Sequence, residues 1–212
     1  NQGNDSIDGG EGNDTVRGGK NEDTVKGGVG DDSVYGDQGD DTVSGEDDND
    51  FVQGNAGNDL VEGNAGNDTV RGGKDQDTVK GGVGDDSVYG DQGDDTVSGE
   101  EGNDFVQGNT GNDLVEGGAG NNTLRGGKDQ DTLIGGQGSD SLYGDKGDDS
   151  LTGGAGADKF YLGFDQDGSF GVDTLTDFNR IEEDKILLSS EGFRALADTL
   201  TAGNNLPADE FA

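Results

Sequence analysis

The sequence predicts an all-β solenoid, and three features of the chain support that fold class. The pattern G-G-x-G-x-D-x-U-x, in which U is aliphatic, recurs without a break in 17 copies from Gly9 to Tyr161. A fixed period this short is typical of solenoids. Proline occurs once and glycine 45 times, and only 25% of the residues are hydrophobic. A core of about one aliphatic residue in nine cannot by itself offset the chain entropy of folding.

Each nonapeptide is expected to form a loop followed by a short strand. Glycine at positions 1, 2 and 4 allows left-handed dihedral angles in a turn that directs several backbone carbonyls to one place. Position 6 is Asp in 16 of the 17 copies and adds a carboxylate there. Positions 7 to 9, such as 15–17 (Thr-Val-Arg), alternate polar and aliphatic residues. They predict a three-residue strand with one inward side chain.

Two nonapeptides would form one flattened turn of 18 residues. Stacked turns would then place Asp14 beside Asp32 on one edge and Asp23 beside Asp41 on the other. A cage of carbonyl and carboxylate oxygens suits Ca²⁺. The formal net charge of −35, from 48 acidic and 13 basic residues, agrees with that ligand and argues against a nucleic-acid partner.

Metal binding and folding are expected to be one process. If neighbouring loops share ions, roughly a dozen or more Ca²⁺ would bind, and without them the chain would stay disordered. The alternative is a disordered, acidic, glycine-rich linker. Such a linker has no reason to keep glycine, aspartate and an aliphatic residue in strict nine-residue phase.

The repeats, for example GGEGNDTVR at 9–17 and GGVGDDSVY at 27–35, resemble the haemolysin-type, or repeats-in-toxin (RTX), calcium-binding nonapeptides. The resemblance implies a right-handed parallel β-roll with Ca²⁺ between successive loops on each edge. In that family, one loop offers the carbonyls of positions 2 and 4 and the Asp of position 6. The loop 18 residues later offers the carbonyls of positions 1 and 3 and its own Asp. Carried over to this chain, one site comprises Gly10, Gly12, Asp14, Gly27, Val29 and Asp32.

The same resemblance implies metal ligands along the whole repeat region. The residues at position 6 are Asp5, Asp14, Asp23, Asp32, Asp41, Asp50, Asp59, Asp68, Asp77, Asp86, Asp95, Asp104, Asp113, Asn122, Asp131, Asp140, Asp149 and Asp158. The carbonyl ligands of further sites include Gly28, Gly30 and Gly45, and then Gly82, Gly84 and Gly99. Asn122 replaces a carboxylate with a neutral amide, so the two sites that it would share are expected to be weaker.

The repeat pattern ends at residue 161, which divides the chain into a calcium-binding β-roll (1–161) and a C-terminal β-rich capping segment (162–212) that is expected to be incomplete. Its sequence FDQDGSFGVDTLTDFNRIEEDKILLSS predicts longer strands and resembles the segment that closes the rolls of this family. The matching residues are Gly171, Asp173, Leu175, Asp177, Phe178, Asp184, Ile186 and Leu188. A solenoid must cover its last apolar turn, so we expect these strands to pack on it. Residues 190–202 predict a short helix, and the chain as a whole is expected to be a piece of a longer protein.

No catalytic constellation is visible in these residues. His and Cys are absent, which excludes zinc-protease, Cys–His and Ser–His–Asp chemistry within them. We therefore expect no enzyme here, and any catalytic domain would lie outside this sequence. No apolar run is long enough to span a membrane. The resemblance implies export through a type I, one-step ATP-driven channel, and hence a secreted, extracellular or cell-surface protein.

Four hypotheses for the role remain open. The first is a secreted calcium-binding module that folds after export. The second is a structural, adhesive or surface-layer segment that associates with itself. Residues 9–62 and 63–116, identical at 47 of 54 positions, would give it a repetitive surface, although recent duplication explains them equally. The third, an ice-binding roll, needs a flat Thr-rich face, which large apolar residues such as Phe51 and Leu60 interrupt. The fourth is the non-catalytic calcium-binding half of a secreted hydrolase.

Overall fold

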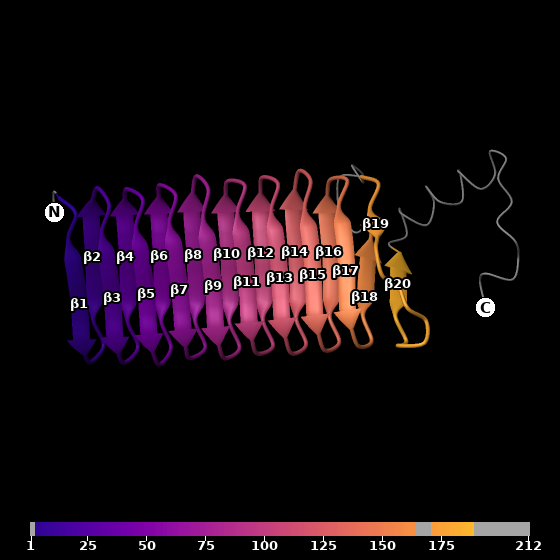
Figure 1. The fold of residues 1–212 in the computed structure, drawn as a ribbon, viewed down its shortest axis with the longest axis horizontal. Coiled ribbons are helices and arrows are strands. Elements are labelled where there is room, and N and C mark those ends of the chain that lie inside the picture. Colours follow the sequence, from indigo (N-terminus) through magenta and orange to yellow (C-terminus); the bar gives the residue numbers. More distant parts are fainter. Residues whose placement is uncertain (1–2, 164–170, 189–212) are drawn as a thin grey trace, which may run out of the picture.

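Figure 1 shows the computed structural model of the chain, which describes residues 3–163 and 171–188. These residues form a solenoid of two parallel β-sheets, and no helix occurs among them. Residues 18 apart are neighbours in each sheet, as in the pair formed by Ile7 and Val25. The predicted all-β parallel solenoid with 18 residues per turn is confirmed.

The strands alternate between the two sheets along the chain, so each sheet keeps the order of the sequence. The first sheet contains β1 (Ser6–Glu11), β3 (Thr24–Val29), β5 (Thr42–Asp47), β7 (Leu60–Ala65), β9 (Thr78–Val83), β11 (Thr96–Glu101), β13 (Leu114–Ala119), β15 (Thr132–Gln137), β17 (Ser150–Ala155) and β19 (Thr174–Leu175). The second contains β2 (Thr15–Lys20), β4 (Ser33–Gln38), β6 (Phe51–Ala56), β8 (Thr69–Lys74), β10 (Ser87–Gln92), β12 (Phe105–Thr110), β14 (Thr123–Lys128), β16 (Ser141–Lys146), β18 (Lys159–Leu162) and β20 (Lys185–Leu188).

The repeat strands are longer than predicted. The strands β1 to β17 have six residues each, running from position 7 of one repeat to position 3 of the next. The expected three-residue strand is wrong because positions 2 and 3 continue the pairing between turns, as Gly10 does with Gly28 and Glu11 with Val29. The alternation of polar and aliphatic residues marks only the first half of each strand.

Glycine at position 1 has a different role from glycine at positions 2 and 4. Positions 2 and 4 do adopt positive φ, for example 98° at Gly10 and 114° at Gly12, and Asn21 accepts 73° at position 4. The position-1 glycines are not in the left-handed region, so that part of the prediction is wrong. A Cβ at Gly18 would lie 2.7 Å from the carbonyl oxygen of Gly36 and 2.8 Å from Oδ2 of Asp23. Position 1 is therefore glycine because other atoms approach it closely.

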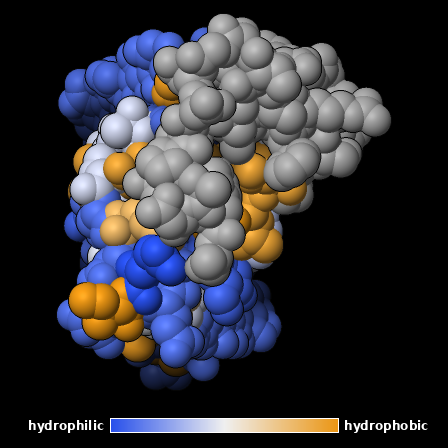
Figure 2. All heavy atoms as spheres, turned by 90° about the vertical axis from the view of Figure 1, so that its right-hand side faces the viewer, coloured by the Kyte–Doolittle hydropathy of each residue, from blue (hydrophilic) through white to orange (hydrophobic). Residues whose placement is uncertain are grey.

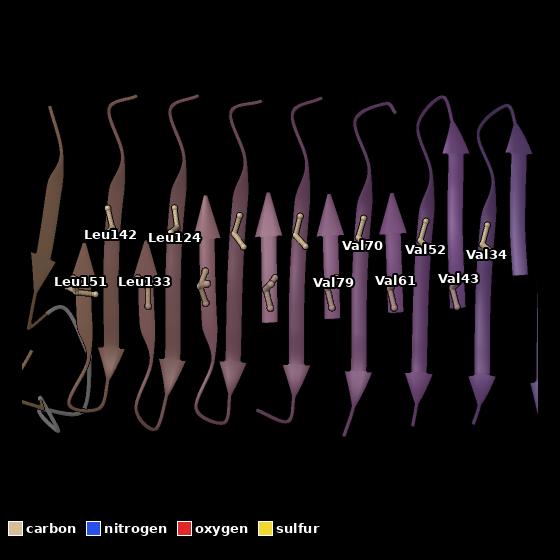
Figure 3. Packing of buried hydrophobic residues seen from close by; sticks show 14 of the residues in the cluster. Val34, Val43, Val52, Val61, Val70, Val79, Leu124, Leu133, Leu142 and Leu151 are labelled. Atoms are coloured by element: carbon tan, nitrogen blue, oxygen red, sulfur yellow. The ribbon is translucent and has the colours of Figure 1, made fainter. Parts of the chain in front are cut away.

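The apolar core is a double row of position-8 side chains that face inward between the two sheets (Figure 3). It consists of Val16, Val25, Val34, Val43, Val52, Val61, Val70, Val79, Val88, Val97, Val106, Val115, Leu124, Leu133, Leu142, Leu151 and Phe160. All of these are fully buried except Val16, which is 6% exposed. Each turn thus adds only two residues to the core, so apolar burial stabilises each turn weakly.

The C-terminal segment adds one more pair of strands, β19 beside β17 and β20 beside β18. They are shorter than predicted. The carboxylate of Asp177 accepts the N–H groups of Gly153 and Gly154 in β17. These N–H groups lie beyond the short stretch of β17 that pairs with β19, so the carboxylate takes the place of strand carbonyls there. Phe178 meets Phe160 edge-on, with 6.2 Å between ring centroids, whereas Ile181 is 92% exposed.

Within the described residues 171–188, the expected packing on the last turn is therefore only partial. Figure 2 looks onto this end of the molecule, where apolar side chains lie beside the grey atoms. The helix predicted over 190–202 lies outside the described residues.

Candidate metal centres

The position-6 aspartates form two continuous columns, one along each edge of the solenoid. The backbone N–H of Asp14 donates to Oδ1 of Asp32 at 2.8 Å, and that of Asp23 donates to Oδ1 of Asp41 at 2.7 Å. The same hydrogen bond recurs from turn to turn. The predicted neighbours on the two edges are confirmed.

The other oxygen of each carboxylate, Oδ2, is buried without a hydrogen-bond partner. This holds for Asp5, Asp14, Asp23, Asp32, Asp41, Asp50, Asp59, Asp68, Asp77, Asp86, Asp95, Asp104, Asp113, Asp131, Asp140, Asp149 and Asp158. From Asp23 onward these side chains are nearly inaccessible, for example 2% exposed at Asp86 and 1% at Asp158. A buried carboxylate oxygen without a partner is strongly destabilising, so a repeated row of them is suited to binding cations.

Backbone carbonyls of the following turn share the space around Oδ2 in most repeats. A Cβ at Gly90 would lie 2.5 Å from Oδ2 of Asp95 and 2.9 Å from the carbonyl oxygen of Gly108. Both oxygens therefore face the same small space between two loops. The absence of a side chain at position 1 leaves that space open.

The six residues predicted to form one site belong to two successive turns that contact each other. The carbonyl of Gly12 faces Gly30, where a Cβ would lie 2.8 Å away, and the carbonyl of Gly10 faces Gly28. From the later turn, the carbonyl of Gly27 points back to Gly9, at 2.5 Å from a Cβ built there.

The fourth predicted carbonyl of this site, that of Val29, accepts the N–H of Gly12 at 2.8 Å. Carbonyls of both turns thus lie at the contact between the two turns, and the carbonyl of Val29 already has a donor.

The other predicted carbonyl residues occupy equivalent places. The carbonyl of Gly45 and Oδ2 of Asp32 meet beside Gly27, and the carbonyl of Gly99 and Oδ2 of Asp86 meet beside Gly81. The remaining four follow the same register. Gly28 pairs with Glu46 and Gly82 with Glu100, Gly30 donates its N–H to the carbonyl of Asp47, and the carbonyl of Gly84 faces Gly102.

The donor set of these gaps fits a hard cation. It contains only carboxylate and carbonyl oxygens, which Ca²⁺ accepts in variable number and geometry at about 2.3–2.6 Å. Within 3–163 and 171–188, no three acidic, His or Cys side chains come together as a metal cluster. Carbonyl oxygens must therefore complete the coordination of any ion bound there.

Comparison with known protein families agrees with this geometry. The sequence profile of the RTX calcium-binding nonapeptide repeat matches residues 1–25, 18–52, 44–79, 71–106, 98–133, 107–142 and 134–168. The chain belongs to the RTX calcium-binding nonapeptide repeat family. No curated protein matches the chain. The described part of this RTX chain contains no helix of the length and apolarity needed to cross a membrane.

Burial of the RTX aspartates strongly changes their acidity. Desolvation, followed by the charges of neighbouring aspartates, raises the pKa of Asp59 to about 7 and of Asp77 and Asp131 to about 8, although the backbone N–H bond to each opposes the change. Burying a carboxylate without a counter-charge favours its neutral form. A bound divalent cation would have the opposite effect.

Asn122 differs from every other RTX position-6 residue of the described chain. Its Oδ1 still accepts the N–H of Asp104 at 2.9 Å. Its Nδ2 lies 2.7 Å from a Cβ built on Gly117, where Asp residues place Oδ2, and donates to the carbonyl of Gly120 at 3.4 Å. An N–H donor thus occupies the place of a ligand oxygen and also engages a position-4 carbonyl.

A second hydrogen-bond ladder, which the pattern did not reveal, lies outside the aspartate columns. At position 5, the N–H of Asn67 donates to Oδ1 of Asn49 and the N–H of Asp85 donates to Oδ1 of Asn67, both at 2.8 Å. The signal for this ladder is the preference for Asn or Asp at position 5. These exposed bonds stabilise the loops without a metal ion.

The outer face of the second sheet carries a cluster that returns every three turns. Arg71 binds Asp91 through two hydrogen bonds, of 2.9 and 2.6 Å, and lies 5.0 Å from the centroid of Tyr89. Arg17 with Asp37 and Arg125 with Asp145 repeat this arrangement. The acids in these pairs belong to position 2, outside the aspartate columns.

Proposed function

We propose that this chain is a calcium-binding module whose folding requires the ion. The observation that carries the proposal is the row of buried Oδ2 atoms without hydrogen-bond partners. In most repeats this oxygen lies beside a backbone carbonyl of the following turn, so one cation between the two turns would bind both the carboxylate and the carbonyl oxygen. Metal binding would then contribute directly to the free energy of folding.

The number of ions follows from the sharing of gaps. Oδ1 of Asp86 accepts the N–H of Asp68 in the turn before, whereas its Oδ2 meets the carbonyl of Gly99 in the turn after. Each carboxylate therefore borders two gaps, and we propose that it serves two ions. Along both columns this gives roughly a dozen or more Ca²⁺, with extracellular-type dissociation constants of about 10⁻⁴ to 10⁻³ M.

We further propose that the module belongs to a secreted or cell-surface protein exported by a type I system. The family membership supports this, and so does the absence of cysteine from the sequence. A module that folds only in millimolar Ca²⁺ would remain unfolded during export and fold outside. Within this proposal the module has no catalytic role of its own, and it would serve a secreted hydrolase equally well.

A structural role at the cell surface is the second candidate. The Arg71–Asp91–Tyr89 cluster and its two equivalents give one sheet a regular outer face. Such a face could assemble laterally with a second copy. Sedimentation of the Ca²⁺-loaded chain tests this, because a monomer at all concentrations would remove the support for self-association.

Circular dichroism with and without chelator tests the calcium function. We expect little β-structure in excess chelator and a cooperative gain of β-structure as Ca²⁺ is added. Mg²⁺ is the matched control, since it demands tighter octahedral geometry and gives up water reluctantly. A native β-spectrum in excess chelator, or equal responses to both ions, would refute the proposal.

A further inference from the structure

We infer that Asp158 and Asp184 form an additional calcium site, outside the nonapeptide repeats, that fastens the C-terminal segment to the last turn. The inference rests on the proposed calcium function and extends it to the junction between roll and C-terminal segment. The repeat period does not indicate this site, because Asp184 follows Asp158 by 26 residues rather than 18.

The backbone around Asp184 reproduces the geometry of a repeat. The N–H of Asp158 donates to Oδ1 of Asp184 at 3.0 Å, which is the bond that links position-6 aspartates of successive turns. The N–H of Lys185 donates to the carbonyl of Asp158 at 2.8 Å, as the N–H of Lys159 does to the carbonyl of Asp140. Asp184 therefore occupies position 6 of a further turn.

The strand that follows confirms this register. β20 pairs in parallel with β18, so that Ile186 lies beside Phe160, the last residue of the apolar core. Asp184 thus stands immediately before its strand, as the position-6 aspartates do in the repeats.

The gap between these two aspartates also contains the feature that marks the repeat sites. Oδ2 of Asp158 has no hydrogen-bond partner, and the residue is 1% exposed. It lies beside Gly153, the position-1 glycine of the same repeat. This buried oxygen faces the last gap of the column, for which only the C-terminal segment can supply the second carboxylate.

The described residues around this gap hold Asp184 in place and add negative charge. The N–H of Asn179 donates to Oδ2 of Asp184 at 2.7 Å and so fixes the carboxylate. Carboxylate oxygens that accept an N–H keep a lone pair for a cation. Besides burial, the charges of Asp184, Asp177 and Glu182 act on Asp158 and raise its pKa. A divalent cation would relieve this repulsion.

Asp184→Asn tests the site, because the amide keeps an oxygen for the N–H of Asp158, as Asn122 does for Asp104. Native mass spectrometry at saturating Ca²⁺ counts the ions on the full chain. We expect one ion fewer in the D184N variant. The matched control is Glu182→Gln, which removes a nearby charge but none of these bonds, and we expect it to keep the full number.

Hydrogen exchange of residues 185–188 provides a second measurement, independent of the count. In the wild type, their protection should appear with Ca²⁺, and D184N should need several-fold more Ca²⁺ to reach it. An unchanged ion count in D184N, or protection of these residues in chelator, would overturn the inference. A wild-type chain that binds no Ca²⁺ would instead refute the proposed function.

Discussion

Replacing Asp86 with asparagine separates the role of the carboxylate charge from that of the hydrogen bond. The amide oxygen can still accept the N–H of Asp68, because Asn122 makes the equivalent bond to Asp104. The variant therefore keeps this hydrogen bond but loses the charged ligand that Asp86 offers to the two gaps on either side, where an amide N–H takes the place of one oxygen. Both ions should bind much more weakly.

The size of the effect follows from linkage. At about 10 mM Ca²⁺ and dissociation constants of about 0.1–1 mM, each lost ion removes about 1.4–2.7 kcal/mol of stability. Asp86→Asn should thus lower the free energy of unfolding by about 3–5 kcal/mol. Asp86→Ala should remove about 1–3 kcal/mol more, because it leaves the buried N–H of Asp68 without an acceptor. Urea unfolding followed by circular dichroism measures both losses.

Asp85→Asn is the matched control, since it makes the same chemical change one residue earlier on the exposed position-5 ladder. Asp85 accepts the N–H of Asn103 at 2.8 Å, and an amide oxygen does the same at Asn67. We expect a change within about 0.5 kcal/mol. Equal losses in D86N and D85N would show that position 6 binds no ion, and half the expected loss would show that Asp86 serves only one.

Three further predictions concern acidity, Asn122 and the C-terminal segment. Burial raises the pKa of Asp77 and Asp131 to about 8, so the metal-free fold should be most stable below the unfolded value of about 4 and lose this contribution as the pH rises from about 4 to about 8. In chelator, circular dichroism should therefore show more β-structure at pH 5 than at pH 8, and the reverse order would contradict the burial of neutral carboxylates. Asn122→Asp should replace a donor by a ligand and lower the Ca²⁺ midpoint, which calorimetry checks; a higher midpoint would mean that Asn122 improves its sites. Deleting residues 162–212 should raise the Ca²⁺ midpoint and promote association, because the edges of the last turn become free; a monomer with an unchanged midpoint would show that the segment does not cap the roll.

Much of the fold could be predicted because one period governs both the core and the loops. Val25 and Asp23, for example, each recur at a fixed position, so burial of one and stacking of the other follow from a turn of 18 residues. The pairing of positions 2 and 3 could not be predicted, because it depends on backbone bonds between turns that no side-chain pattern reports. The close approach at Gly18 likewise depends on atoms of the following turn.

The C-terminal segment was harder to predict because its register changes. Asp173 and Asp184 continue the two columns after insertions, at 24 and 26 residues from their partners. A search for a nine-residue period passes over such positions. Ile181 is apolar, yet it lies in the turn before β20 and is 92% exposed.

Each turn contacts only the turns next to it. The length of this molecule can therefore change by whole blocks of six repeats, such as 9–62 or 63–116. Removing residues 63–116 would join Glu62 to Gly117 and preserve the order of positions 9 and 1. The strands brought together would repeat pairings already present, and the molecule would shorten by three turns, or about 14 Å at about 4.8 Å per strand. Recombination between the two near-identical blocks would therefore produce longer or shorter chains that still fold, and the number of blocks would set the length of the solenoid.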